Sequence, residues 1–273
     1  LAAPRNVAVV RTVTRAPPHQ GDLRGRILRF LERRARSRVG TRFIVPNEGS
    51  RGLAVNSYGA ADGHVTVLPT SVDVAGVRDA VKRNSRGHAR VLLGIEPDET
   101  AVVLLTNFAS ASRMDQILQG FHTARTAQPK LRLFIVGSGR NESSTRWKAE
   151  ELRLGDSVIF LGRGTDSGPI WAAADVAIDA TPQSSWCRAA LVAIAAGVPT
   201  AKRHDGASEW PDELGEEFPM ISGHPERFAM ELVQMAAGHG LMEQVAAYGQ
   251  KVAREVDVGS VAQKLGSLYD SLA

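Results

Sequence analysis

Short apolar runs alternate with amphipathic segments through residues 101–200, and this alternation restricts the fold more than any other feature of the chain. One amphipathic segment places Met114, Ile117, Leu118 and Phe121 at positions i, i+3, i+4 and i+7, on one face of a helix. Strands alternating with helices predict βαβ units, a parallel sheet and right-handed crossovers. The predicted strands are AVVLLT (101–106), LRLFIVG (131–137), SVIFLG (157–162) and DVAIDA (175–180), and further helices are predicted over 147–154, 171–174 and 189–196, the last stopped by Gly197 and Pro199.

The first 70 residues differ from this pattern. They hold three strand candidates, which fall short of a complete Rossmann half of about five strands. We therefore expect a partial α/β domain over 1–70, a Rossmann-like domain with helices on both faces of its sheet over 71–256, and a closing helix over 257–273. The early strand candidates are VAVVRTV (7–13), RFIVP (42–46) and HVTVLP (64–69), with helices predicted over 22–36 and 48–58 and throughout 224–272.

Composition narrows the class of protein. The 273 residues are 43% hydrophobic and 23% charged, as in an ordinary globular protein. We find no run of about 18 uncharged apolar residues, which a membrane-spanning helix needs, and no secretory-signal pattern at the start. Cys187 is the single cysteine, so the chain forms no internal disulfide and a cytoplasmic, reducing location is expected. The seven histidines lack the spacing of a metal site, so no metal is expected.

Positive charge is concentrated near the start. Residues 1–42 contain eleven arginines against the two acids Asp22 and Glu32, although the net charge of the whole chain is only +4. The segment 22–38 can present an apolar stripe with arginines around it. This helix either has a solvated basic face or makes a peripheral contact with an anionic membrane at the inner face. Nucleic acid is not an expected partner, because the segment lacks the interleaved aromatic residues of a single-strand platform.

Seven segments follow one another in an order and spacing that are typical of one family. They are HVTVLPTSVD (64–73), RVLLGIEPDETAVVLLTNF (90–108), LRLFIVGSG (131–139), AEELRLGDSVIFLGR (149–163), WAAADVAIDATP (171–182), ALVAIAAGVPT (190–200) and the closing helices from 252 onward. Together they resemble the family 4 retaining glycosyltransferases of GT-B fold. The part upstream resembles the end of that family's acceptor-side domain, so we expect a missing N-terminal segment or a partner chain.

The resemblance implies a site for a leaving diphosphate. Glycosyl transfer breaks the bond between the anomeric carbon and the diphosphate, and the developing negative charge needs fixed cations or aligned backbone N–H donors. The family carries an Arg in the loop after the first strand and a Lys five residues later, and these positions hold Asn107 and Ser112 here. Arg113, the next residue, either replaces the lost cation or is an exposed residue of the first helical turn.

A second family feature is a pair of glutamates, one for the donor sugar and one for the ribose. In this register they fall on Ser184 and Val192. Val192 cannot accept a hydrogen bond, which removes a charge-assisted contact worth roughly 1.5–3 kcal/mol, or about ten- to a hundredfold in affinity. Ser184 can still donate to a sugar oxygen. Asp179, at a nearby strand end, either compensates for the lost carboxylates or caps a turn.

The remaining candidates for nucleotide-sugar binding lie in loops. The backbone N–H groups of Trp186, Cys187 and Arg188 are expected to point at the diphosphate from a helix N-terminus. Trp186 stacks on the donor or belongs to the core, and Cys187 is expected to be a wall residue rather than a nucleophile. The others are Gly137 and Gly139, whose backbone approaches a phosphate or forms only a tight turn, Gly162 and Arg163 beside the nucleobase, and Glu209 in a Gly-x-x-Glu loop beside the donor.

Two classes of function follow. The first is transfer of a hexosyl group, with retention of configuration, from a nucleoside-diphosphate sugar to a glycan, lipid-linked or small-molecule acceptor. The nucleotide of the donor is expected to be UDP or GDP, and no further cofactor is expected. Arg113 and Ser184 are the catalytic candidates for it. The alternative is a degenerate GT-B domain that acts as a binding or scaffold subunit, since Asn107, Ser112 and Val192 depart from the family. Fold alone does not separate the two.

Overall fold

The computed structural model describes residues 9–13, 41–163, 167–181, 187–204, 220–238 and 241–272. Contacts divide the chain into two compact units: Leu1–Ser71, Trp210–Glu213 and Val258–Ala273 form the first, and Val72–Glu209 with Leu214–Asp257 the second. The basic segment 22–38, with the helix expected over 22–36, lies outside the described residues. None of the helices in the described ranges has the length and apolar composition of a membrane-spanning segment.

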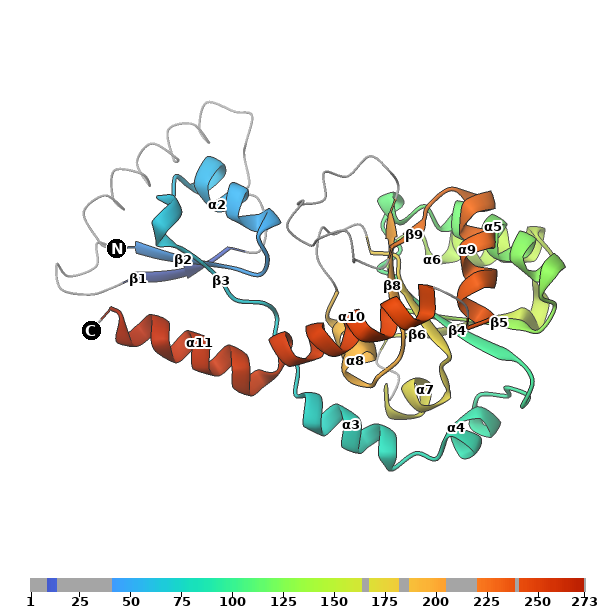
Figure 1. Cartoon of the computed structure of the whole chain (residues 1–273). Helices are drawn as coiled ribbons and strands as arrows, with labels where there is room; N and C mark the ends of the chain where they lie inside the picture. The colour runs from blue at the N-terminus through green and yellow to red at the C-terminus, as the bar shows by residue number, and fades with distance from the viewer. Residues whose placement is uncertain are drawn as a thin grey trace. The chain divides into compact units, whose positions relative to one another are not determined.

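The first unit contains a small parallel sheet (Figure 1). β1 (Val9–Thr12), β2 (Thr41–Val45) and β3 (Val65–Val67) pair in that order, and α2 (Gly49–Tyr58) follows β2. Apolar side chains of β2 and α2 form one cluster, so the small sheet has a core of its own. α11 (Val258–Asp270) groups with this unit, whereas we expected the final helices to close the larger sheet. An apolar period shows that a helix has a contact face, but not which surface that face meets.

The second unit is built on six parallel strands in the order β6-β5-β4-β7-β8-β9. Numbered by appearance this is 3-2-1-4-5-6, the doubly wound order of a Rossmann-like sheet. The four predicted strands are confirmed as β4 (Thr100–Leu105), β5 (Leu131–Val136), β6 (Val158–Gly162) and β7 (Val176–Asp179). The sequence did not predict β8 (Thr200–His204), because Thr-Ala-Lys-Arg-His contains no apolar run. It did not predict β9 (Met220–Ser222) either, which is only three residues long.

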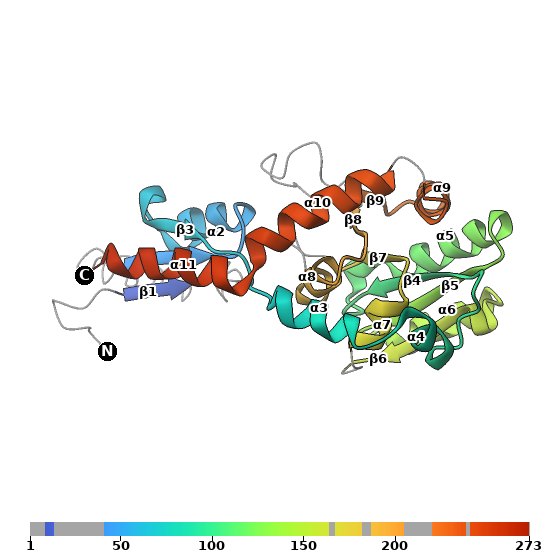
Figure 2. The same cartoon turned by 60° about the horizontal axis from the view of Figure 1, so that its bottom comes forward.

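Helices cover both faces of this sheet, as expected (Figure 2). Along β4, Val102 and Leu104 join a cluster with α5 and α9, and Val103 and Leu105 join one with α7 and α8. This alternation is the period of a strand that is buried on both faces. The helices are α3 (Val74–Lys82), α4 (Arg86–Leu92), α5 (Met114–Ala127), α6 (Glu142–Glu151), α7 (Ser167–Ala173), α8 (Arg188–Ala195), α9 (Pro225–Ala236) and α10 (Leu241–Val256), with short 3-10 turns at Asp62–His64, Ser110–Ser112 and Gly155–Ser157.

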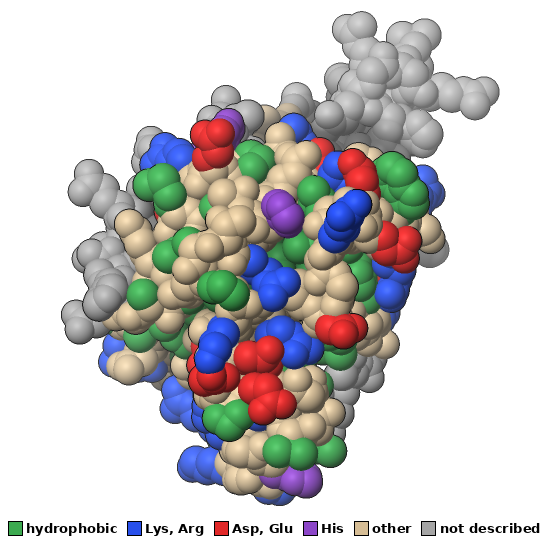
Figure 3. All heavy atoms as spheres, turned by 90° about the vertical axis from the view of Figure 1, so that its right-hand side faces the viewer, with side chains coloured by type: hydrophobic (Ala, Val, Ile, Leu, Met, Phe, Trp, Pro, Cys, Tyr) green, Lys and Arg blue, Asp and Glu red, His purple; other side chains and the backbone are tan. Residues whose placement is uncertain are grey.

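Two differences from the sequence prediction concern helices. The helix expected over 147–154 begins earlier, since α6 runs from Glu142 to Glu151. α3 and α4 were not predicted at all. α4 leaves Val91 and Leu92 exposed, so its apolar residues do not mark a buried face. Figure 3 shows that acidic, basic and apolar side chains are interspersed on the face seen there, without a continuous basic area.

Candidate functional site

The carboxyl ends of the six parallel strands meet at one edge of the sheet, and doubly wound folds bind ligands there, where the strand order reverses. The reversal lies between the paired neighbours β4 and β7. The helix after β4, α5, packs on one face of the sheet, and the helix after β7, α8, packs on the other. The segments that leave β4 and β7 therefore flank the expected ligand position.

The loop after β4 is closed by its own hydrogen bonds. The Asn107 Oδ1 atom accepts from the Ala109 amide at 3.1 Å and from the Ser112 hydroxyl at 3.2 Å. Asn107 is exposed, while Ser112 is fully buried at 0% exposure. The two positions at which the resembling family carries cations are therefore bonded to each other in this chain.

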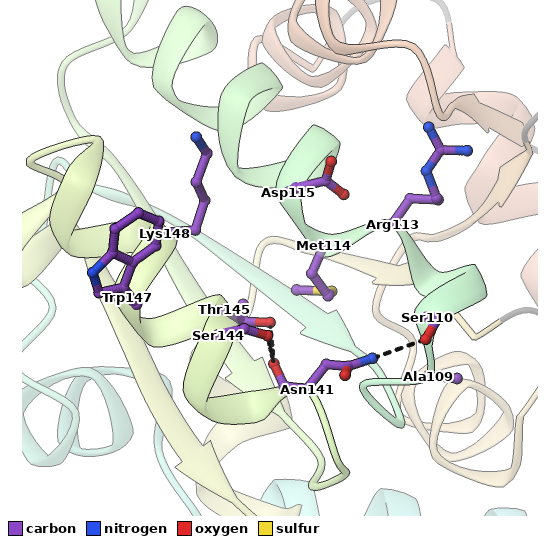
Figure 4. Close-up of a pocket in the computed structure, with 10 residues that line it drawn as sticks. All are labelled: Ala109, Ser110, Arg113, Met114, Asp115, Asn141, Ser144, Thr145, Trp147 and Lys148. Atoms are coloured by element: carbon purple, nitrogen blue, oxygen red, sulfur yellow. Dashed lines mark hydrogen bonds between the residues drawn. The ribbon is translucent and has the colours of Figure 1, made fainter.

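Arg113 ends this loop as the N-cap of α5. It is exposed and has φ 47° and ψ 47°, the left-handed region. Holding a residue with a Cβ there costs about 1–2 kcal/mol. Figure 4 shows the guanidinium directed away from the pair formed by Asn141 and Ser110, whose side chains are hydrogen-bonded at 3.3 Å. Arg113 thus stands at the carboxyl edge as an exposed cation on a strained residue.

The turn after β5 packs directly against the β4 loop. A Cβ on Gly137, which has φ 141°, would lie 1.7 Å from the Thr106 carbonyl oxygen, and a Cβ on Gly139 would lie 1.9 Å from that of Asn107. The Gly137 amide also donates to the Gly162 carbonyl, at the end of β6, at 3.0 Å. Both glycines therefore serve the close approach of neighbouring loops. Gly162 has φ 71°, and the Arg163 side chain after it is exposed.

A buried ion pair joins the last residue of β7 to the middle of β8. Asp179 and Lys202 are both 0% exposed, and Lys202 Nζ lies 3.0 Å from Asp179 Oδ2. Lys202 Nζ also donates to the carbonyl and hydroxyl oxygens of Thr181, at 2.9 and 3.0 Å. The other carboxylate oxygen, Asp179 Oδ1, accepts from the amide and the hydroxyl of Thr181, at 2.9 and 2.6 Å. Asp179 is therefore engaged within the protein, in agreement with the turn-capping alternative.

Cys187 connects this pair to α8. Its amide donates to Asp179 Oδ2 at 2.9 Å, so this N–H is not directed at a ligand. Its Sγ atom accepts from the Ala190 amide at 3.4 Å and caps the helix. Burial, followed by the negative charge of Asp179, raises the pKa of the Cys187 thiol to about 12. A thiol that stays protonated at neutral pH is a poor nucleophile.

Sequence reasoning missed two charged residues of this edge, Lys202 and Arg203. Arg203 is 7% exposed, and its Nη1 atom donates to the Ser112 carbonyl at 2.7 Å. Arg203 therefore brings a buried cation from β8 to the very residue at which the resembling family has a lysine. The available signal was the pair of consecutive charges shortly after Gly197-Val198-Pro199, a turn that a buried strand can follow.

The other sequence candidates fall in different places. Arg188, the first residue of α8, is exposed at this edge. Val192 is partly buried and packs against apolar clusters, as its side chain requires. Ser184, Trp186 and Glu209 lie outside the described residues. Among the described residues, no group of three or more His, Cys, Asp or Glu side chains is placed to hold a metal ion.

A hollow of about 340 Å³ opens between the first turns of α5 and α6. Figure 4 shows Met114 between the two helices, with Asp115 and Lys148 along one side and Asn141 on the other. A larger hollow of about 650 Å³ lies at the opposite, amino-terminal edge of the sheet, beside Arg90 and Asp175. There the charged groups bind each other, with Arg90 Nη1 3.2 Å from Asp175 Oδ2. The carboxyl-edge hollow adjoins the β4 loop and is the one relevant to the site.

Sequence comparison finds glycosyltransferases among the relatives of this chain. The alpha-monoglucosyldiacylglycerol synthase of Streptococcus pneumoniae is 26% identical over 136 residues, 49% of this chain and 31% of that protein. The D-inositol 3-phosphate glycosyltransferase of Segniliparus rotundus is 24% identical over 240 residues, 85% of this chain and 51% of that protein. The chain thus spans about half or less of these relatives' length.

The fold is also that of solved glycosyltransferases. The structure of HepE from Anabaena in complex with UDP-glucose matches with a TM-score of 0.72 at 16% identity, over 96% of this chain and 72% of that one. This likeness confirms the expected α/β GT-B fold. The family model described as glycosyl transferases group 1 matches residues 99–238, which include β4 to β9 and the loops of the carboxyl edge. The match covers just over half of the chain, which therefore belongs to the group 1 glycosyl transferases.

Proposed function

We propose that this chain carries the donor-binding part of a retaining glycosyltransferase, which moves a hexosyl group from a nucleoside-diphosphate sugar to an acceptor. The observation that carries the proposal is the reversal of strand order between β4 and β7 in a group 1 glycosyl transferase sheet. It gathers Arg113, Gly137, Gly162 and Arg188 at one edge, where a diphosphate sugar fits the fold.

UDP-glucose is the first donor to test. The HepE structure contains UDP-glucose, and another HepE structure contains UDP and glucose. The name of the pneumococcal relative describes a glucosylated lipid, which supports a lipid-linked acceptor. Such an acceptor lies at a membrane surface. Peripheral docking through the basic segment 22–38 therefore belongs to the proposal, although that segment lies outside the described residues.

In the proposed reaction, the bond between the anomeric carbon and the diphosphate oxygen breaks, and a bond from that carbon to the acceptor oxygen forms on the same face. The acceptor proton passes to the leaving phosphate oxygen. The protein has to stabilise the negative charge that grows on that phosphate. Arg113 approaches from the β4 side and Arg188 stands on the β7 side, so each can supply a cation that positions 107 and 112 do not.

One observation favours the alternative of a binding or scaffold subunit. Ser112 is fully buried and its hydroxyl is bonded to Asn107, so the β4 loop is complete without a ligand. A domain of this kind binds a nucleotide sugar without turning it over. Binding and turnover must therefore be measured separately.

Titration calorimetry with UDP, GDP and ADP, each with and without its sugar, tests donor binding. We expect heat from at least one diphosphate, and tighter binding of the corresponding sugar donor. No heat at millimolar concentration with any of them refutes the proposal. Release of UDP from UDP-glucose in the presence of acceptor extracts then separates the readings: binding without turnover identifies the scaffold alternative.

A further inference from the structure

The buried pair Asp179–Lys202 is an unusual feature to find at a ligand-binding edge. Both side chains are 0% exposed, and removing two charges from water costs several kcal/mol per ion unless the geometry is excellent. Here the geometry is excellent. Lys202 Nζ donates to three oxygen atoms, and each Asp179 oxygen accepts two hydrogen bonds.

The partners of the pair show what it holds together. Thr181 lies two residues after the end of β7, and Cys187 is the residue just before α8. Asp179 binds the amides of both, and Lys202 ties the carbonyl of Thr181 to β8. The pair thus fixes both ends of the β7–α8 connection to the end of the sheet.

We infer that the Asp179–Lys202 pair is a positioning device, which fixes the first turn of α8, and with it Arg188, beside the donor diphosphate. This inference rests on the proposed function. Two further observations agree with it. Asp179 lies on β7, which pairs with β4 at the point where the strand order reverses. The Cys187 amide to which Asp179 is bonded belongs to the N-cap residue of α8. Asp179 and Lys202 are positioning residues, because neither reaches solvent to touch a substrate.

The single cysteine of the chain supplies a reporter for this device. Cys187 is partly buried, and Asp179 both binds its amide and adds to the causes that keep its thiol protonated. Loss of the pair should release the start of α8 and make the thiol more acidic. Each unit by which the thiol pKa falls multiplies the thiolate fraction, and so the alkylation rate, by about ten.

The test uses the double variant Asp179→Leu/Lys202→Met, which removes both charges and leaves neither one buried alone. Circular dichroism and thermal melting establish that the variant is folded, iodoacetamide labelling over a pH series reports on Cys187, and calorimetry reports on UDP and UDP-glucose. We expect a folded variant with labelling faster by about tenfold or more and nucleotide affinity lower by about tenfold.

Asp175→Asn is the matched control. It removes a carboxylate that binds Arg90 and the Ala101 amide at the opposite edge of the same sheet. It should lower the melting temperature without changing labelling or affinity.

The labelling rate and the nucleotide affinity of a folded variant decide the inference. A folded double variant with the labelling rate of the parent overturns it, and so does faster labelling with unchanged affinity. If the double variant does not fold, Asp179→Asn/Lys202→Gln, which also removes both charges but keeps polar side chains, is judged by the same two readouts. If the parent itself binds no nucleotide, the proposed function fails, and the labelling rate still decides whether the pair holds α8.

Discussion

Replacing glycines by alanine tests the close contact between the β5 turn and the β4 loop. Gly137 and Gly139 lie in that contact, and Gly155, which lies outside it, is the comparison. A Cβ atom makes ordinary van der Waals contacts at 3.4 Å and beyond. The Cβ of Gly137→Ala would lie 1.7 Å from the Thr106 carbonyl oxygen, so this distance would have to double. Gly137 also has φ 141°, which costs a residue with a Cβ about 1–3 kcal/mol. Gly139→Ala meets a backbone oxygen at 1.9 Å without a positive φ, and Gly155→Ala has φ 50° with no atom within 4 Å.

We therefore expect Gly155→Ala to cost about 1 kcal/mol of unfolding free energy. Gly139→Ala should cost about 3 kcal/mol and Gly137→Ala more than that, near the upper end of single substitutions. Urea titrations followed by circular dichroism measure the three values, and calorimetry with a nucleotide measures affinity. Because the collision displaces the β4 loop, Gly139→Ala should also weaken nucleotide binding, while Gly155→Ala should not. Equal costs in all three variants would refute the reasoning from close approach.

Three further predictions concern the same edge. Arg113→Gly should raise the unfolding free energy by up to about 1 kcal/mol, since glycine tolerates the left-handed region, whereas Arg113→Ala should leave it nearly unchanged. Both variants should lose nucleotide affinity equally in calorimetry, and parental affinity in either would assign Arg113 to the solvated surface. The raised pKa of Cys187 means that its thiol stays protonated in the fold between pH 9.0 and about 12, while the unfolded chain ionises. The unfolding free energy should therefore fall as the pH rises through this range, and less steeply in Cys187→Ser; identical slopes in denaturant titrations would contradict this. Arg203→Met should lower stability by about 1–3 kcal/mol, because it leaves the Ser112 carbonyl without its charged donor, and a stability equal to that of the parent would show that this bond contributes little.

The strands that could be predicted are those buried on both faces by apolar side chains. β4 and β5 read as mostly apolar runs because each has helices above and below it. β8 is as deeply buried, but Lys202 is paired with Asp179 on β7 and Arg203 is hydrogen-bonded to the Ser112 carbonyl, and a single sequence does not reveal such partners. The same limitation hid the role of Asp179.

The candidate site was predictable as a place more than as a set of contacts. The order of strands and helices placed the candidate site at the carboxyl edge of the sheet, and Arg113 and Arg188 are exposed at that edge. The prediction that the Cys187 amide faces a diphosphate was wrong, because that amide donates to Asp179. For Gly137 and Gly139 the sequence left two alternatives open, approach to a phosphate or only a tight turn, and in the structure both pack against the β4 loop. Distances between loops that are far apart in sequence decide such cases, and they arise from packing rather than from local pattern.

Hydrogen–deuterium exchange with and without saturating UDP-glucose tests the central claim most directly, because it locates binding on the chain. The account predicts slower exchange in residues 107–113, 137–141 and 187–190, which follow β4, β5 and β7. It predicts no change in residues 94–99, beside the larger hollow at the amino-terminal edge. Protection confined to 94–99, or no protection anywhere at a concentration that saturates the parent in calorimetry, would contradict it.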